Sequence, residues 1–279
     1  MASRVRFCRP AALGLGALIA GTLALAADVA PRPIVPLAPP APAAIPGGPL
    51  GDAIRLGERI VTDTRIAARA YVGNGLRCSS CHLDAGRTAY AAPLAGLTGL
   101  FPEYRSRRGA VESLEERIND CFLRSMNGQA LPAASREMIG LLAYVAWLSQ
   151  GVPAGSEVAG RGFREIAAPG PPDAARGRAL YAARCAACHG AEGLGVKSAA
   201  DRYALPPLWG PDSFNVGAGM ARVSVAAAFI QAKMPLGNAG TLTDQEAYDV
   251  AAYVTAQPRP DFPGRQSDWP RGGRPADAR

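Results

Sequence analysis

The sequence predicts an all-helical protein built from two small domains in tandem. Two blocks of the chain share the same order of features, apolar residues in both recur at helical spacing, and the alternation typical of strands is scarce. A chain of 279 residues fits two domains of ordinary size. With 48% hydrophobic and 19% charged residues the chain can form packed cores, which excludes a disordered protein.

The first 27 residues have the pattern of a secretory signal peptide. Three arginines precede an apolar run that ends in Ala-Leu-Ala at residues 24–26, a small-x-small cleavage site. The run is short for a membrane span, so we expect cleavage and export to the periplasm, with an uncleaved anchor as the alternative. Cleavage removes Cys8 and leaves five of the six cysteines in an oxidising compartment, with no stable membrane insertion expected.

Segments rich in proline and glycine indicate the domain boundaries. Residues 28–50 are a Pro- and Ala-rich linker, 153–172 separate the two blocks, and 258–279 are expected to form an extended tail. The domains are therefore expected at residues 51–152 and 173–257.

The first domain opens with a predicted amphipathic helix over residues 52–61. Its last predicted helix carries apolar residues at helical spacing: Met138, Leu141, Leu142, Val145 and Leu148. Between these two, Ser113 and Glu116 form a capping box at the start of a third helix, which Asn127-Gly128 ends. Spacings of three and four residues put Cys121 on the apolar face of that helix, so its thiol is expected to point inward.

The second domain repeats this plan. A predicted helix over residues 174–183 opens it. Thr243 and Glu246 form a capping box before a closing helix with the apolar residues Ala247, Val250, Ala251 and Val254.

Each domain carries a C-x-x-C-H motif after its first helix: Cys78, Cys81 and His82 in one, Cys185, Cys188 and His189 in the other. This motif attaches c-type haem, because two thiols one helical turn apart bond the vinyl groups and the adjacent histidine binds the iron. A single zinc site formed by the four cysteines would not explain why a histidine follows each cysteine pair. Two disulfide bonds would leave the same histidines without a role. The sequence therefore predicts two class I cytochrome c-like domains, each with one covalent haem.

The chain has only two histidines, so the second axial ligand of each iron must come from Met, Cys or Lys. In the second domain we predict Met234, which precedes a proline and follows His189 by 45 residues. Met220 is the competing methionine, and Lys233 could bind the iron if it lost its proton.

In the first domain the candidate ligand is Cys121, 39 residues after His82. It is the odd cysteine of the mature chain, and an unpaired thiol in an oxidising compartment is expected to be buried, ligated or functional. The alternative is an inert buried cysteine, with Met126 or Met138 as the iron ligand.

Arginines cluster around this helix. Arg117 and Arg124 flank Cys121, and three more precede it: Arg105, Arg107 and Arg108. Arginine suits multidentate capture of oxyanions, although a solvated basic surface or haem-propionate partners are alternatives. The formal charge of +7 is too small and too dispersed to predict nucleic-acid binding. The cluster indicates a small sulfur oxyanion held over a redox-active thiol.

On these motifs the sequence resembles the di-haem cytochrome c thiosulfate dehydrogenases. The resemblance runs from residue 51 to the tail, and the stretch around Cys121 is its most specific part. The matching stretches are YVGNGL at 71–76, FP-x-YR at 101–105, LEERIN-x-CF-x-RSMNG at 114–128, PLWGP-x-SFN at 207–215 and KMP at 233–235.

The resemblance implies oxidation of two thiosulfate ions to tetrathionate, with two electrons passed to a small redox protein such as a c-type cytochrome. It implies a catalytic haem held by His82 and Cys121, with Cys121 as the sulfur that bonds substrate. A second haem, held by His189 and Met234, would be the electron exit, with Lys233 as an alternate ligand. The positions that bind substrate match Arg107 and Arg117 in this sequence.

Three alternatives remain at this point. A non-enzymatic electron-transfer cytochrome would use Met126 or Met138 at the first haem and show no thiosulfate chemistry. A cysteine-ligated haem protein that conjugates sulfur substrates would require a carrier protein. Tetrathionate reduction is the same chemistry run backwards.

Overall fold

The computed structural model describes residues 31–167, 169–198 and 202–279. The predicted signal peptide lies outside these residues. Residues Arg32–Arg279 form one compact unit, and the description below concerns this unit. Among the described residues, no helix is long and apolar enough to cross a membrane.

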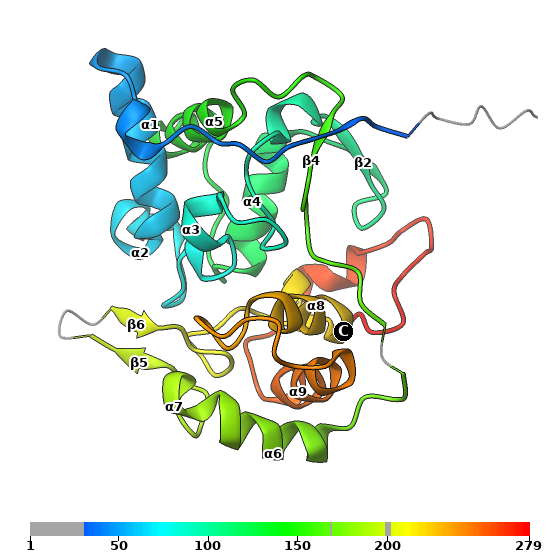
Figure 1. The fold of residues 1–279 in the computed structure, drawn as a ribbon. Coiled ribbons are helices and arrows are strands. Elements are labelled where there is room, and N and C mark those ends of the chain that lie inside the picture. The colour runs from blue at the N-terminus through cyan, green and yellow to red at the C-terminus, as the bar shows by residue number, and fades with distance from the viewer. Residues whose placement is uncertain (1–30, 168, 199–201) are drawn as a thin grey trace, which may run out of the picture. The chain divides into compact units, whose positions relative to one another are not determined.

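Helices dominate both blocks, and the strands are two or three residues long (Figure 1). The first block contains α1 (Gly48–Thr62), α2 (Thr64–Ala67), α3 (Leu83–Gly86), α4 (Leu114–Arg124) and α5 (Arg136–Leu148). The second contains α6 (Ala174–Arg184), α7 (Ala186–His189), α8 (Val223–Lys233) and α9 (Asp244–Ala256). Short 3-10 helices complete the helical elements: η1 (Pro42–Ala44), η2 (Arg69–Tyr71), η3 (Cys78–Ser80), η4 (Leu97–Gly99), η5 (Gly219–Ala221) and η6 (Pro263–Ser267).

The strands form three separate pairs. The pairing of β1 (Ile34–Val35) with β4 (Glu157–Val158) is parallel. The pairs β2 (Glu103–Arg105) with β3 (Ala110–Glu112), and β5 (Val196–Lys197) with β6 (Tyr203–Leu205), are antiparallel. The structure thus has the helical composition that the sequence predicts.

In both domains the first long helix packs against the last one. Helix α1 packs on α5, and α6 packs on α9. A Cβ atom on Gly57 would collide with the carbonyl oxygen of Gly140, and a Cβ atom on Gly177 would collide with that of Asp249. Glycine at these two positions therefore lets the helix backbones touch, and its repetition explains the similarity of the two blocks.

Local hydrogen bonds start the helices where the sequence predicts. At α4 the Glu116 amide donates to Ser113 Oγ at 3.3 Å, and the Ser113 amide donates to Glu116 Oε2 at 2.8 Å. Thr243 and Glu246 form the equivalent box at α9. Both predicted capping boxes are confirmed, and Asn127, with a φ of 46°, lies just beyond the end of α4.

One segment of the second block, between α7 and α8, belongs to the core of the first block. Phe214, Ala218 and Ala221 are buried with residues of α1, α4 and α5. The second domain has its own cores, one of which contains Tyr181, Trp209, Val250 and Val254. The chain therefore shares residues between its domains instead of joining two independent cores.

Two buried asparagines fix this shared segment. Asn74 Nδ2 donates to the carbonyl oxygens of Ser125 and Ser213 at 2.8 and 3.1 Å. Asn215 Nδ2 donates to the carbonyl oxygen of Leu123 at 2.9 Å, and its backbone amide donates to that of Arg124 at 3.1 Å. These bonds satisfy the carbonyl groups at the end of α4, which have no partner within the helix.

The proline-rich ends of the chain are more ordered than their composition indicates. Strand β1 and the start of α1 lie in the segment expected to be a linker. Residues 258–279, expected to be an extended tail, contain η6 and fold back on the domains, with Trp269 only 9% exposed. At the end of the tail, Asp277 Oδ2 accepts from the backbone amide of Ser224 at 2.8 Å, in the first turn of α8. Composition alone could not reveal these distant partners.

Candidate functional site

Both C-x-x-C-H motifs fold into a single helical turn. The backbone amide of His82 donates to the carbonyl oxygen of Cys78 at 2.9 Å, and that of His189 donates to Cys185 at 2.9 Å. Each turn brings its two thiols and its imidazole to one side, as haem attachment requires.

The imidazole rings are oriented for iron. Nδ1 of His82 donates to the carbonyl oxygen of Ala92 at 2.6 Å, and Nδ1 of His189 donates to that of Pro206 at 2.9 Å. A histidine that uses Nδ1 in this way keeps Nε2 available for a metal, in a fixed orientation. The donor set therefore fits two c-type haems.

The predicted residues of the first site come together around one cavity. Its lining includes both cysteines of the first motif, His82 and Cys121, and also residues of the shared segment. The full set is Leu76, Arg77, Cys78, Cys81, His82, Cys121, Ser125, Met126, Phe214 and Met220. The inward direction predicted for Cys121 is that found in the structure.

Cys121 has a different charge environment from the attachment cysteines. Burial by itself would raise the pKa of its thiol, but the Arg117 guanidinium and a hydrogen bond with His82 outweigh burial and lower this pKa to about 7. Nη1 of Arg117 lies 3.5 Å from the sulfur. In contrast, burial raises the pKa of Cys78 to about 11 and that of Cys81 to about 12. Of these three thiols, only that of Cys121 has a pKa low enough to form a thiolate near neutral pH.

The methionines named as alternatives occupy different places. Met126 lines the same cavity as Cys121, next to the end of α4. Met138 is fully buried in the first-domain core. Met220, considered for the second haem, lines the first cavity because the shared segment carries it there.

The arginines divide between two locations. Arg117 donates to Cys121, as the helical spacing indicates. Arg107 and Arg124 instead donate from Nη1 to the carbonyl oxygen of Gly217, at 2.7 and 3.3 Å. Gly217 belongs to the shared segment that carries Phe214 and Met220 to the cavity, so these two arginines contact a segment that lines it.

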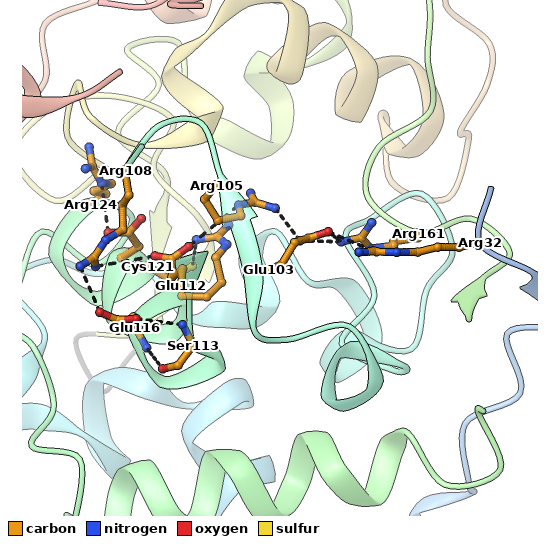
Figure 2. A network of polar contacts seen from close by, with 12 residues as sticks. Arg32, Glu103, Arg105, Arg108, Glu112, Ser113, Glu116, Cys121, Arg124 and Arg161 are labelled. Atoms are coloured by element: carbon orange, nitrogen blue, oxygen red, sulfur yellow. Dashed lines mark hydrogen bonds and ion pairs between the residues drawn. The ribbon is translucent and has the colours of Figure 1, made fainter. Parts of the chain in front are cut away.

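A chain of carboxylates and arginines extends from this site, as Figure 2 shows. Glu112 is 1% exposed and lies 3.9 Å from Nε of Arg105. Arg105 in turn contacts Glu103, which also accepts from Arg32 and Arg161 at 3.0 and 3.2 Å (Figure 2). Sequence analysis missed both glutamates, because strands of three residues are too short to show which side chains turn inward.

The second site is assembled around α8. Met234 follows the last residue of α8, and its backbone amide donates to the carbonyl oxygen of Ile230 at 2.8 Å. Ile230 packs in the same cluster as Cys185 and Ala186 of the second haem motif. Burial lowers the pKa of Lys233, which favours the neutral amine that can bind a metal. Met234 and Lys233 as ligands stay predictions.

Comparison with known proteins finds two family models that match successive parts of the chain. Residues 69–154 match the family model "SoxA/TsdA, cytochrome c domain", and residues 172–254 match "Cytochrome C oxidase, cbb3-type, subunit III". The thiosulfate dehydrogenase of Allochromatium vinosum is 50% identical over 242 residues, 85% of this chain and 90% of that protein. The chain belongs to the thiosulfate dehydrogenase family. The prediction of two cytochrome c domains, each with one covalent c-type haem, is confirmed.

Other members of the thiosulfate dehydrogenase family agree. The thiosulfate dehydrogenase of Stutzerimonas stutzeri is 46% identical over 226 residues, covering 81% of this chain and 73% of that protein. The solved thiosulfate dehydrogenase TsdBA of Marichromatium purpuratum is 44% identical with a TM-score of 0.78. That match covers 81% of this chain and 50% of the solved chain, so this chain spans half the length of that structure.

Proposed function

We propose that this protein is a periplasmic enzyme that joins two thiosulfate ions into tetrathionate and passes two electrons to a c-type cytochrome. One observation carries the proposal. The Cys121 thiol, with its pKa lowered to about 7, lies between His82 and Arg117 in the cavity of the first haem motif. The relatives named thiosulfate dehydrogenase support thiosulfate as the substrate.

The residues of the chain divide the work between two haems. Cys78 and Cys81 would attach the first haem, and His82 and Cys121 would bind its iron. The second haem would be held by the other C-x-x-C-H motif and by Met234, with Lys233 as an alternate ligand. When bound, the two haems supply two one-electron acceptors, which suits a two-electron oxidation.

The Cys121 sulfur performs the bond chemistry. Its thiolate bonds the sulfane sulfur of one thiosulfate, forming a cysteine S-thiosulfonate with one negative charge and releasing two electrons. A second thiosulfate attacks the sulfane sulfur of that adduct. The new S–S bond forms as the bond to Cys121 breaks, so tetrathionate leaves and the thiolate is regenerated. No proton is consumed or released in the sum of the two steps.

The arginines would reduce the electrostatic repulsion between two thiosulfate dianions. Two unit charges 4 Å apart repel by about 4 kcal/mol at an effective dielectric constant of 20, and each thiosulfate carries two charges. Arg117, at the sulfur, would stabilise the adduct and the incoming anion. Arg107, which donates to Gly217 in the segment that lines the cavity, would hold a sulfonate group.

The test is thiosulfate-dependent reduction of ferricyanide by the purified holoprotein, with tetrathionate quantified. We expect turnover by the wild type and none by Cys121→Gly with both haems attached. Cys121→Met keeps a sulfur that can bind iron but cannot form the adduct, so it should also be inactive. Tetrathionate formation by either variant at a tenth of the wild-type rate or more would refute the mechanism.

An inactive wild type with both haems intact would refute the proposed function itself. The first-haem spectrum then discriminates between the remaining alternatives. A histidine–thiolate iron has its own low-spin paramagnetic signature, whereas a histidine–methionine iron indicates an electron carrier.

A further inference from the structure

The C-terminal segment reaches Arg107 and Arg124, the two arginines that donate to Gly217. The carboxylate of Asp268 accepts two parallel bonds from Arg124, with Nη2–Oδ1 at 2.8 Å and Nη1–Oδ2 at 2.9 Å. Both side chains are at least nine-tenths buried. The ring of Phe262 lies 4.4 Å from the Arg124 guanidinium carbon. This side chain of α4 is therefore held on several sides by a segment far from it in sequence.

Arg107 is held by the same segment. Its guanidinium carbon lies 4.9 Å from the centre of the Trp269 ring, and its Nε lies 3.9 Å from Asp268 Oδ2. The backbone amide of Trp269 donates to the Arg107 carbonyl oxygen at 2.8 Å. Backbone and side chain of Arg107 are thus both fixed by two consecutive tail residues.

These contacts bring a buried cation, Arg124, and a partly buried one, Arg107, together. Burial and the positive charge of Arg124 lower the pKa of Arg107 to about 10, and Asp268 acts in the opposite direction. Without a carboxylate the two guanidiniums would repel each other and separate. Trp269 has a φ of 56°, a conformation that costs free energy for a residue with a side chain and persists where other contacts impose it.

Two contacts connect Arg107 and Arg124 to the site around Cys121. Arg124 lies three residues after Cys121 on α4, and both guanidiniums share the carbonyl oxygen of Gly217. Gly217 lies between Phe214 and Met220, which line the cavity that contains Cys121. A displacement of Arg107 would therefore act on the segment that lines this cavity.

We propose that Asp268 and Trp269 are positioning residues for substrate binding, which hold Arg107 beside Arg124 so that the Arg107 guanidinium receives the sulfonate group of thiosulfate. This inference rests on the proposed function. Asp268 holds the cations together and the Trp269 ring supports one face of the Arg107 guanidinium. The tail then determines the affinity for the anion and leaves the Cys121 chemistry unchanged.

The test compares variants of the holoprotein in KM, in kcat and in the Kd for thiosulfate measured by calorimetry. Asp268→Asn and Trp269→Ala should raise KM and Kd about tenfold, the equivalent of one charged hydrogen bond, with kcat little changed. Trp269→Phe keeps an aromatic face and should restore most of the affinity. Asp261→Asn is the matched control, because this exposed tail carboxylate forms its ion pair with Arg265 of the same segment, at 3.3 Å.

The outcomes separate the explanations. A lower KM in Asp268→Asn would mean that Asp268 weakens anion binding by its charge, which overturns the positioning role. Unchanged KM with a shifted reduction potential of the first haem would assign the arginines to a haem propionate and also overturn it. If Asp268→Asn fails to fold, the comparison of Trp269→Ala with Trp269→Phe decides.

Failure of the proposed function is distinguishable from failure of this inference. A wild type without turnover refutes the former, and the calorimetric Kd values still test whether the tail sets thiosulfate affinity. Wild-type turnover with unchanged KM and Kd in both tail variants refutes the latter alone.

Discussion

Replacing Arg117 by methionine should remove most of the catalytic power of the first site. The change keeps a long flexible side chain but takes away the guanidinium whose Nη1 lies 3.5 Å from the Cys121 sulfur. Burial raises the pKa of this thiol, and the positive charge of Arg117 opposes burial more than any other neighbour does. The variant therefore loses both the stabilisation of the thiolate and a donor to the bound anion.

The size of the effect follows from the distance. Two unit charges 3.5 Å apart attract by roughly 5 kcal/mol at an effective dielectric constant of 20, which is an upper limit for this pair. Loss of one preorganised donor to a reacting anion lowers kcat by about 10²–10³ in other enzymes. We expect Arg117→Met to lower kcat/KM for thiosulfate by about two orders of magnitude. Arg117→Lys keeps the charge without the planar fork and should lose less.

The pH dependence has a definite sign. Without Arg117, burial dominates and the pKa of Cys121 rises. The fraction of thiolate at neutral pH then falls, so the residual activity of Arg117→Met should increase as the pH is raised above neutral. Arginine at this position should make the wild type less sensitive to pH in the same range.

The assay is thiosulfate-dependent ferricyanide reduction between pH 6 and pH 9, with Arg136→Met as the matched control. Arg136 belongs to the same domain, and its side chain is 76% exposed, so this variant loses one charge without touching the site. A kcat/KM for Arg117→Met within threefold of that of Arg136→Met would refute the electrostatic reasoning. Unchanged haem spectra in both variants would show that the loss is not one of assembly.

Three further predictions concern the second domain. Asp249→Asn should lower the Tm at neutral pH, because several hydrogen bonds outweigh burial and hold the folded-state pKa of this carboxyl low. The stabilisation is present above about pH 4 and is lost as the pH falls through the folded-state pKa. An equal Tm difference between variant and wild type at pH 3 and pH 7 would contradict this. Gly177→Ala should reduce the free energy of unfolding by about 1–3 kcal/mol in denaturant titrations, whereas Gly219→Ala, in open space, should not. Met234→Ala should abolish the histidine–methionine near-infrared band of the second haem, with both haems still attached. Replacing Lys233 as well should leave that iron without a strong sixth ligand. Survival of the band in Met234→Ala would exclude Met234 as the iron ligand.

Local features of this protein could be read from the sequence. A haem motif needs only one helical turn, and a capping box needs four residues. The roles of these residues therefore depend only on neighbours in sequence: His82, His189, Ser113 and Thr243. The direction of Cys121 follows from helix periodicity in the same way. Specific stretches around these residues also carried the resemblance to the family.

Roles that depend on distant partners could not be read in this way. Met220 was a candidate for the second haem, but two buried asparagines, Asn74 and Asn215, fix its segment on the first domain. Glu112 is buried although it is a carboxylate, because Arg105 and Arg108 lie at 3.9 and 3.8 Å. Neither position has a local pattern that marks it as inward.

The tail shows the difference most clearly. Composition predicts an extended segment at residues 258–279, since proline and glycine disfavour helices and strands. Tertiary structure decided that Asp268 meets Arg124 across 144 residues of sequence, and that Trp269 covers Arg107. A hydrogen bond within one helical turn is determined by neighbouring residues. A buried ion pair between a domain and a distant tail forms only where packing brings both side chains together and excludes water.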